Sequence, residues 1–452
     1  MKQMTKYKGK KVIVIGLARS GMSAAKLLHR LGAFVTVNDL TPIAENNDAQ
    51  ALEKEGIRVV TGGHPVELLD KGFDYLVKNP GIPYENVMVK GAIERNIPVL
   101  TEVELAYAIC DAEIIGVTGT NGKTTVVMML DKVMNKNQEN SAKLAGNIGF
   151  PASTVAQTME KNQYMITELS SFQLMGIESF RPHIALITNL FEAHLDYHHT
   201  RKEYIEAKLN IQKNMTADDY LILNIDQKEG KAVAQYTKAQ VISVSLNNQE
   251  ATAYCHDGKL YYKTEYIMDA KEIGVPGKHN IYNALMVIAC AKLCHLSNEV
   301  IREGIQSFKG ATHRLQYVTE INGVSYYNDS KATNAESTKS ALSGFEPTKL
   351  TLLLGGLDRG DEGELTTEDL KNVHCVIAFG ETRDKMEILA KRAGVSSVYK
   401  VETIAEAVPL AQKVTKKGAT VLLSPAHASW DQYKTFEERG DDFMNEVKKL
   451  KG

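Results

Sequence analysis

Cysteine is scarce in this chain. Five cysteines occur among 452 residues, and none forms a Cys-x-x-Cys pair or a finger-like spacing; they are Cys110, Cys255, Cys290, Cys294 and Cys375. This usage argues against a disulfide scaffold and against a zinc ribbon. The sequence also lacks internal repeats of 20–50 residues and low-complexity tracts, which excludes solenoid architectures.

An excess of either charge is missing too. The formal net charge is -2 and there is no long basic run, so we expect no nucleic-acid partner and no binding to an anionic membrane surface. No apolar stretch approaches the roughly 20 residues that cross a bilayer. Residues 1–11 are polar and basic without an apolar core, which does not fit a secretory signal. We therefore expect a cytoplasmic protein, in which any phosphate binding is local.

What the chain does contain is typical of a globular protein of several domains. Hydrophobic residues make up 43% and charged residues 24%, and the length favours two or three domains. Residues 11–38 read as strand, glycine turn, helix and strand, a βαβ unit. Short apolar runs at 74–77 and 98–100 continue a parallel sheet, and a helical stretch over 101–109 leads out of it. The first domain boundary is predicted near residue 101.

A second α/β region of alternating strands and helices follows. It contains a small antiparallel patch between about 240 and 275. Helical periodicity resumes at 280–293. The third region begins near residue 311 and again alternates strands with helices. The fold class is therefore α/β with three domains, 1–101, 102–310 and 311–452. The predicted strands of the second and third regions are 113–117, 163–168, 184–189, 220–224, 324–327, 350–354, 373–379 and 420–424.

A glycine-rich loop follows the first predicted strand. It runs Gly16-Leu17-Ala18-Arg19-Ser20-Gly21 and resembles a dinucleotide-binding fingerprint in which alanine replaces the second glycine. Free N–H groups at the start of the next helix suit a pyrophosphate, and Asp39 ends the next strand at the spacing of a ribose-binding carboxylate. From these residues alone two interpretations stay open: a nucleotide site, or a tight turn from strand to helix.

A second loop gives the sharper signal. It lies between a predicted strand and a predicted helix and reads Thr118-Gly119-Thr120-Asn121-Gly122-Lys123-Thr124-Thr125. This is similar to a P-loop, although the first glycine of the general pattern falls at Val117. In such loops backbone N–H groups surround phosphate oxygens, the lysine meets the β- and γ-phosphates, and a hydroxyl reaches Mg²⁺. The sequence therefore predicts ATP binding by Gly119 to Thr125.

Two polar clusters follow later strands of the same region. Glu168 ends a predicted strand, which brings its carboxylate to the sheet edge beside the P-loop; the alternative is an acid at a helix amino terminus. The segment His194-Leu195-Asp196-Tyr197-His198-His199 follows another strand. A zinc site there is disfavoured, because no second group of histidines or cysteines stands at a suitable spacing.

Together with these motifs, further segments resemble the Mur ligase family over essentially the whole chain. In order, they are Gly146-Asn147-Ile148-Gly149, Ala207-Lys208, Gly277-x-His279-Asn280, His313-Arg314 and Asn328-Asp329-Ser330-Lys331-Ala332-Thr333-Asn334. The Asn79-Pro80-Gly81-Ile82 turn and residues 423–440 look like the D-glutamate-adding members, and the Asp-Asn-Pro-Arg motif of the diamino-acid-adding relative is absent. The resemblance implies a Rossmann-like first domain, a P-loop ATPase-like central domain and a Rossmann-like third domain.

The resemblance also implies how ATP and metal are held. Lys123 would bind the ATP phosphates, Thr124 and Glu168 one Mg²⁺, and His194 with Lys208 a second. An ammonium cannot ligate a cation, but in this family the equivalent lysine is carbamylated, which makes it a carboxylate-like ligand. From the sequence alone Lys208 reads as an exposed helix lysine. The remaining residues implied for ATP are His279, Asn280 and Asn283 towards the adenine, and Arg314 and Asp329 towards ribose and phosphates.

The two other substrates implied are UDP-N-acetylmuramoyl-L-alanine and D-glutamate. The first glycine loop then holds UDP rather than NAD, with the residues Arg19, Ser20, Asp39, Thr41, Gly81 and Asn147. D-Glutamate is framed by Lys331, Thr333, Ser429 and Phe436. The family places a lysine for this amino acid near residues 355–359, where the chain offers Arg359 in a shifted loop, and arginine is not an equivalent cation.

The expected reaction is ATP-dependent amide-bond formation. The substrate carboxylate attacks the γ-phosphate to give an acyl phosphate and ADP, and the D-glutamate amine then displaces phosphate. Closure about a hinge near residues 310–312 would protect the acyl phosphate from water, and we expect a monomer. The alternatives are an NAD-dependent oxidoreductase built on residues 11–39, a related folate-type polyglutamate ligase, and a nucleotide-sensing module without catalysis.

Overall fold

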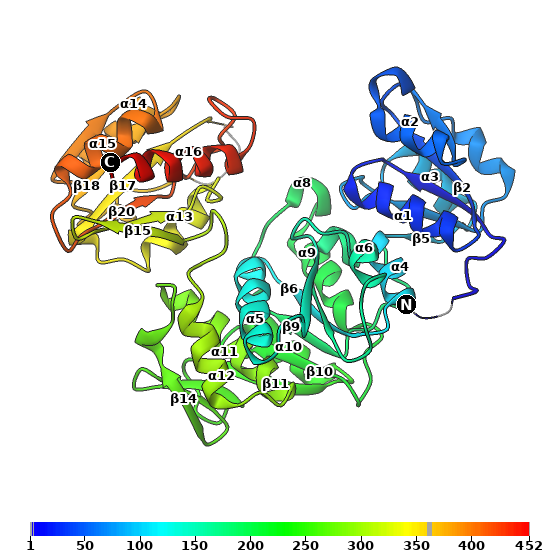
Figure 1. The fold of residues 1–452 in the computed structure, drawn as a ribbon, viewed down its shortest axis with the longest axis horizontal. Coiled ribbons are helices and arrows are strands. Elements are labelled where there is room, and N and C mark those ends of the chain that lie inside the picture. The colour runs from blue at the N-terminus through cyan, green and yellow to red at the C-terminus, as the bar shows by residue number, and fades with distance from the viewer. Residues whose placement is uncertain (1, 3, 359–363, 452) are drawn as a thin grey trace. The chain divides into compact units, whose positions relative to one another are not determined.

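Three β-sheets form the framework of the computed structural model, which describes residues 2, 4–358 and 364–451 (Figure 1). Two compact units divide the chain: Met1–Met268 with Leu285–Gly304, and Asp269–Ala284 with Ile305–Gly452. The first two sheets belong to the first unit, apart from the last residue of the second sheet, and the third sheet belongs to the second unit. The domain boundaries near residues 101 and 310 stay predictions.

The first sheet has five parallel strands in the order β3-β2-β1-β4-β5. Alternate residues of its central strand enter different cores: Val12 and Val14 pack in one, Ile13 and Ile15 in the other. Both faces are therefore covered by helices, which is why these strands read as continuous apolar runs. The elements are β1 (Lys11–Ile15), α1 (Arg19–Arg30), β2 (Phe34–Asp39), η1 (Ile43–Glu45), α2 (Asn47–Lys54), β3 (Arg58–Thr61), η2 (Val66–Lys71), β4 (Tyr75–Lys78), α3 (Val87–Glu94), β5 (Val99–Leu100) and α4 (Glu102–Ile109).

The second sheet has nine strands in the order β14-β13-β12-β11-β10-β9-β6-β8-β7. The strands predicted at 113–117, 163–168, 184–189 and 220–224 are confirmed. The predicted antiparallel patch is only partly correct, because β11 pairs in parallel with both β10 and β12, and β12 with β13 is antiparallel. The strands are β6 (Glu113–Thr118), β7 (Ala142–Gly146), β8 (Tyr164–Glu168), β9 (Ile184–Ile187), β10 (Tyr220–Asn224), β11 (Gln240–Ser245), β12 (Ala253–His256), β13 (Lys259–Tyr262) and β14 (Glu265–Asp269).

Helices between these strands carry much of the site. In every parallel pair the strand leaves the sheet at its carboxyl edge, so the segments that follow β6, β8 and β9 gather there. The helices are α5 (Lys123–Asn137), α6 (Ala152–Ala156), α7 (Ser171–Leu174), α8 (Leu195–His198), α9 (Arg201–Leu209), η3 (Asn210–Gln212), α10 (Lys228–Tyr236), η4 (Ala270–Glu272), α11 (Lys278–Leu293) and α12 (Asn298–Ser307). No helix among the described residues has the length and apolar character of a membrane span.

The third sheet has six strands in the order β15-β16-β20-β17-β18-β19, of which only β15 is antiparallel to its neighbour. Leu352 and Leu354 pack in a core with α13 and α14, whereas Leu353 packs with α15 and α16 on the other face. The four strands predicted here are confirmed. The elements are β15 (Gln316–Ile321), β16 (Val324–Asn328), α13 (Ala335–Leu342), η5 (Pro347–Lys349), β17 (Leu350–Gly355), β18 (Cys375–Phe379), α14 (Arg383–Arg392), β19 (Ser397–Lys400), α15 (Ile404–Val414), β20 (Thr420–Leu423) and α16 (Phe436–Lys449).

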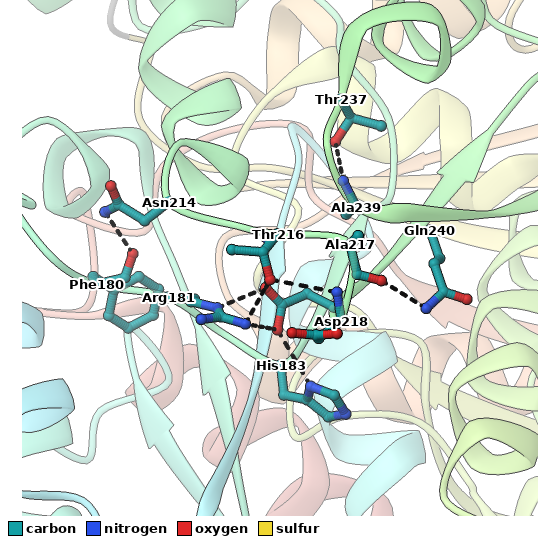
Figure 2. A network of polar contacts seen from close by, with 11 residues as sticks. Phe180, Arg181, His183, Asn214, Thr216, Ala217, Asp218, Thr237, Ala239 and Gln240 are labelled. Carbon is teal, nitrogen blue, oxygen red and sulfur yellow. Dashed lines mark hydrogen bonds and ion pairs between the residues drawn. The ribbon is translucent and has the colours of Figure 1, made fainter.

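A polar network fixes the opposite, amino-terminal edge of the second sheet, where β9 and β10 begin (Figure 2). Arg181 donates from Nε to Asp219 Oδ2 at 2.7 Å and from Nη2 to Thr216 Oγ1 at 2.7 Å. His183 Nδ1 lies 3.3 Å from Asp219 Oδ1. Asp219 is buried, and burial alone would raise its pKa; the hydrogen bonds from Arg181, the Thr216 backbone and His183 outweigh burial and lower the pKa. The network therefore stabilises the fold at a distance from the sheet's carboxyl edge.

Replacing Asp219 with asparagine should lower the free energy of unfolding by about 1–3 kcal/mol at pH 8, because a buried charged acceptor of hydrogen bonds from the half-buried Arg181 is lost. A lowered pKa means that the stabilisation is complete above the ordinary value of 3.8 and disappears as the pH falls through the folded-state pKa. Urea denaturation at pH 8 and pH 3 measures this difference. The exposed neighbour Asp218→Asn is the control, and equal stability of the two variants at pH 8 would contradict the assignment.

Candidate active site

The P-loop joins β6 to α5 at the carboxyl edge of the nine-stranded sheet, as predicted from the sequence. Its backbone requires glycine at Gly119, where φ is +141° and a Cβ atom would collide with Thr188 Oγ1. Lys123 begins the helix, and its ammonium donates to the carbonyl oxygens of Gly119 and Thr120 at 2.8 and 2.9 Å. The lysine thus lies over its own loop, at the amino terminus of a helix, which is suited to phosphate oxygens.

Two residues that follow β9 hold this loop from the neighbouring strand. Asn189 accepts from the Thr120 and Asn121 N–H groups through its carbonyl and side-chain oxygens, at 2.9 and 2.8 Å. Thr188 donates from Oγ1 to the Asn121 carbonyl at 2.6 Å. Sequence reasoning missed both residues as part of the site. Their signal was a polar Thr-Asn pair directly after a buried strand that neighbours the P-loop strand.

Glu168 ends β8, next to β6, and is 2% exposed. The Asn147 side chain donates to Glu168 Oε1 at 2.8 Å, whereas Oε2 has no hydrogen-bond partner within the described part of the chain. A buried carboxylate oxygen without a donor is costly. Glu168 Oε2 is therefore available for a further contact at the sheet edge, and the interpretation as a mere helix-terminus acid does not account for its burial.

Lys208 is buried, unlike the exposed helix lysine that the sequence alone predicts. It lies on α9 at 2% exposure, with Nζ 4.6 Å from the centre of the Tyr204 ring. Burial, helped by the charge of Lys123 and opposed by that of Glu168, lowers its pKa to about 6. These three side chains are therefore electrostatic neighbours. An amine in this environment is largely neutral at pH 7.

An aromatic cluster on α7, α8 and α9 surrounds this point. It consists of Phe172, His194, Tyr197, His198 and Tyr204. The Phe172 ring lies 5.3 Å from His194, 4.4 Å from Tyr197 and 5.3 Å from His198, and the Tyr204 ring lies 6.2 Å from His194. Tyr204 also donates its hydroxyl to Thr120 Oγ1 at 3.2 Å. The cluster thus joins the His194 loop to the P-loop.

The donor set fits a hard cation. Thr124 lies in the first turn of α5, and Glu168, His194 and Lys208 approach the same sheet edge from three further segments. Within the described residues no group of three or more histidine, cysteine and acidic side chains could hold a metal. The Thr124 hydroxyl and the Glu168 carboxylate, with one unbonded oxygen, instead offer oxygen ligands, which Mg²⁺ prefers.

Five of the residues predicted for UDP lie at the carboxyl edge of the five-stranded sheet: Arg19, Ser20, Asp39, Thr41 and Gly81. Ser20 follows β1 and accepts from Asn79 Nδ2 at 3.2 Å, and Arg19 stands exposed beside it. Asp39 ends β2, and its two oxygens accept from the Leu17 and Thr41 N–H groups at 2.8 and 2.9 Å, which shapes both loops. Gly81 lies in the turn after β4. Asn147, predicted for the same substrate, is exposed in the 147–150 loop after β7.

In the second unit, the residues predicted for adenine and ribose lie together. Asn280 donates to the Pro276 carbonyl at 2.5 Å, and Asn283 donates to Asn280 Oδ1 at 2.9 Å, so both hold the first turn of α11. Burial and the charge of Arg314 lower the pKa of His279 to about 4. Burial raises the pKa of Asp329 to about 6, against the charge of Arg314 and hydrogen bonds from Ser424 and Leu315. Arg314 is therefore an electrostatic neighbour of both groups.

Of the residues predicted for D-glutamate, Lys331 and Thr333 lie in the loop after β16, Ser429 lies in the loop after β20, and Phe436 begins α16. Lys331 Nζ lies 5.4 Å from the centre of the Phe436 ring, and Thr333 donates its N–H to the Lys331 carbonyl. Ser429 is buried, and the adjacent Trp430 is 61% exposed. Arg359 lies outside the described residues.

Arg439 is a structural residue of this region that sequence reasoning did not single out. It is fully buried on α16 and donates to Ser330 Oγ at 3.0 Å and to the carbonyls of Ser330, His427 and Ala428 at 2.9, 3.0 and 3.1 Å. Burial lowers its pKa to about 10. The guanidinium thus ties together the two loops that carry Lys331 and Ser429.

Comparison with known sequences decides the family. The model described as "Mur ligase MurD-like, N-terminal domain" matches residues 10–101, "Mur ligase middle domain" matches 117–291, and "Mur ligase, glutamate ligase domain" matches 313–427. The chain belongs to the Mur ligase family. Similar curated relatives include the UDP-N-acetylmuramoylalanine--D-glutamate ligases of Enterococcus faecalis, 54% identical over 452 residues, and of Listeria monocytogenes, 51% identical over 451 residues. In each case the match covers 100% of this chain and 99% of the relative.

Solved structures of other Mur ligases share the fold. The UDP-N-acetylmuramate-alanine ligase MurC from Thermotoga maritima superposes with a TM-score of 0.57 at 18% identity, covering 98% of this chain and 100% of that one. MurF from the same organism, solved in complex with ADP, gives 0.58 at 15% identity, covering 98% and 96%. The predicted α/β fold of three Mur ligase domains is thereby confirmed.

Proposed function

We propose that this Mur ligase is an ATP-dependent enzyme of peptidoglycan precursor synthesis that adds D-glutamate to UDP-N-acetylmuramoyl-L-alanine. The observation that carries the proposal is the convergence of Lys123, Glu168 and Lys208 at the carboxyl edge of one sheet. This occurs in a chain that is 54% identical along its whole length to a relative named for that reaction. The substrate carboxylate attacks the γ-phosphate of ATP, and the D-glutamate amine then attacks the acyl phosphate with release of phosphate.

Phosphoryl transfer of this kind leaves little covalent chemistry to the protein, so positioning and charge neutralisation are its main contributions. Lys123 exchanges its two loop carbonyls for ATP phosphate oxygens, while Asn189 keeps the loop backbone in place. Thr124 and Glu168 would hold one Mg²⁺ and His194 with Lys208 a second, and such ions would supply positive charge beside the phosphates. The unbonded Glu168 Oε2 supports this assignment, because ligation would satisfy it.

Carbamylation of Lys208 belongs to the same proposal. The reaction joins CO₂ to a neutral amine, forming an N–C bond and releasing one proton. The burial of Lys208 and its pKa of about 6 keep the amine neutral at pH 7. The product is an anion next to Lys123, where the buried ammonium form would face a like charge.

The remaining site residues keep the roles assigned from the family. For the UDP substrate these are Arg19, Ser20, Asp39, Thr41, Gly81 and Asn147. For ATP they are Gly119 to Thr125 with His279, Asn280, Asn283, Arg314 and Asp329. For D-glutamate they are Lys331, Thr333, Ser429, Phe436 and, beyond the described residues, Arg359. We also propose a cytoplasmic monomer with domains at 1–101, 102–310 and 311–452.

The deciding experiment measures phosphate release with ATP, Mg²⁺ and UDP-N-acetylmuramoyl-L-alanine while D-Glu, L-Glu, L-Lys and L-Ala are offered in turn. Only D-Glu should sustain release, at least about a hundredfold above the others, because a site that pairs every polar group of its ligand rejects analogues that leave groups unpaired. An equal response to L-Lys would reassign the amino-acid substrate.

The same preparation tests the oxidoreductase alternative. NADH fluorescence should be unchanged by the protein, since Asp39 already accepts two N–H groups of its own loops. Tight quenching of NADH without phosphate release would favour the oxidoreductase.

A further inference from the structure

Lys78 is the last residue of β4 and is 1% exposed. Its ammonium donates to the carbonyl oxygens of Ile82 and Pro80 at 2.8 and 3.0 Å, and to the Tyr197 hydroxyl at 3.1 Å. Within the described residues no carboxylate lies within salt-bridge distance of it. Burial lowers its pKa to about 7, with Glu85 opposing. A buried lysine without an ionic partner is costly, and a methionine would fill the same space.

The two carbonyls belong to the Asn79-Pro80-Gly81-Ile82 turn. Asn79 in that turn donates to Ser20 Oγ at 3.2 Å and accepts the Gly81 N–H at 3.3 Å. The Ile82 side chain packs over Gly16, the first residue of the glycine loop. Lys78 therefore fixes a turn that forms one wall of the proposed UDP site.

Tyr197 extends the contact into the second sheet. It lies on α8, 119 residues further along the chain, and its hydroxyl donates to the Ile82 carbonyl at 3.0 Å. Its ring lies 4.4 Å from Phe172 in the aromatic cluster. Through that cluster it connects with His194, a proposed metal ligand, and with Tyr204, which donates to the P-loop.

We propose that Lys78 is a positioning residue. Through Tyr197 it fixes the Asn79-Pro80-Gly81-Ile82 turn, beside the proposed UDP site, relative to the residues proposed to bind metal and phosphate. The inference rests on the proposed function and deepens it. The substrate that spans the two sides is UDP-N-acetylmuramoyl-L-alanine, whose nucleotide and reacting carboxylate are far apart. In this proposal Lys78 contacts neither the nucleotide nor the carboxylate of the substrate. It sets the position of the residues that bind the nucleotide relative to those that bind the carboxylate.

The test compares Lys78→Met, Tyr197→Phe and the double variant. Lys78→Met should raise the KM for the UDP substrate about tenfold, and Tyr197→Phe about threefold in the same direction, because each removes part of one contact. The KM for D-glutamate should stay within twofold of the parent. The double variant should be no worse than Lys78→Met, since both changes cut the same link. Lys143→Met is the matched control, because its ammonium also donates to a backbone carbonyl, that of Thr158 at 2.9 Å.

A purely structural role would lower the melting temperature and leave the ratio of the two KM values unchanged; that result overturns the proposal, as does additivity in the double variant. Should Lys78→Met fail to fold, Tyr197→Phe alone decides, since an unchanged KM for the UDP substrate in this variant also overturns it. Calorimetric titration with the UDP substrate gives the same comparison without turnover. If the parent protein binds this substrate but shows no phosphate release with D-glutamate, the proposed function is wrong. The effect of Lys78→Met on binding of the UDP substrate can still be measured in that case.

Discussion

Replacing Lys123 with alanine should reduce ATP-dependent phosphate release by about 10³-fold or more, because preorganised charge is usually the largest contribution to such a reaction. The Lys123 ammonium bonds to Gly119 and Thr120 of its own loop. Its removal therefore takes away the proposed phosphate contact together with these two hydrogen bonds within the loop. The measurement is phosphate release at saturating D-glutamate, accompanied by the melting temperature.

The control for this variant is Lys132→Ala on the same helix, where the lysine is exposed. It should keep full activity, since α5 loses only a solvated side chain there. Undiminished turnover in the Lys123 variant would remove the P-loop from the mechanism altogether. A large fall in melting temperature for Lys123→Ala alone would instead point to a structural role.

Replacing Lys208 with methionine should reduce phosphate release by about 10²–10³-fold, the usual consequence of losing one charged group from a preorganised site. The parent protein should lose activity in CO₂-depleted buffer and regain it with bicarbonate, whereas the variant should respond to neither. Carbon-13 NMR with labelled bicarbonate should give a carbamate signal in the parent that is absent from Lys208→Met. Lys202→Met is the control, because Lys202 lies on the same helix and its side chain is 84% exposed.

The pH dependence follows from the pKa of about 6 for Lys208, well below its ordinary value of 10.5. At pH 8 this amine is nearly all neutral, whereas an ordinary lysine is neutral in roughly one molecule out of 250. Between these two pKa values the unfolded chain binds more protons, so the uncarbamylated protein gains stability as the pH rises from 6 to 10.5. Lys208→Met should lack this slope and be at least as stable at pH 7. A variant that unfolds at pH 7 would contradict the burial argument.

The central strands could be predicted from sequence because they are buried on both faces. β1, β6, β10 and β17 are dominated by apolar residues, and each lies inside its sheet. Three parallel edge strands were missed, β3, β7 and β19, because an edge strand pairs on one side only and needs a weaker apolar pattern. In β7 the run Ala-Lys-Leu-Ala-Gly has no pattern that separates it from a loop.

The site divides in a similar way. The P-loop follows from local spacing, because one strand, one loop and one helix contain all of it. Lys78 and Tyr197 are 119 positions apart in the chain, and Arg439 and Ser330 are 109 positions apart. No local sequence pattern predicts contacts over such separations. Lys208 could not be recognised as buried from the sequence, since α9 also carries the charged, exposed residues Arg201, Lys202, Glu203 and Glu206. Lys208 lies on the buried side of α9 together with Tyr204, whose hydroxyl contacts the P-loop at Thr120.

The exposed indole of Trp430 is the chain's single tryptophan. It stands next to Ser429, in a loop whose His427 and Ala428 carbonyls accept hydrogen bonds from Arg439. Excitation near 295 nm therefore addresses one known position in the second unit, and no other residue contributes to the emission. The chain carries an intrinsic optical reporter beside the proposed amino-acid pocket, so that occupancy of this pocket becomes observable by titration without any attached label.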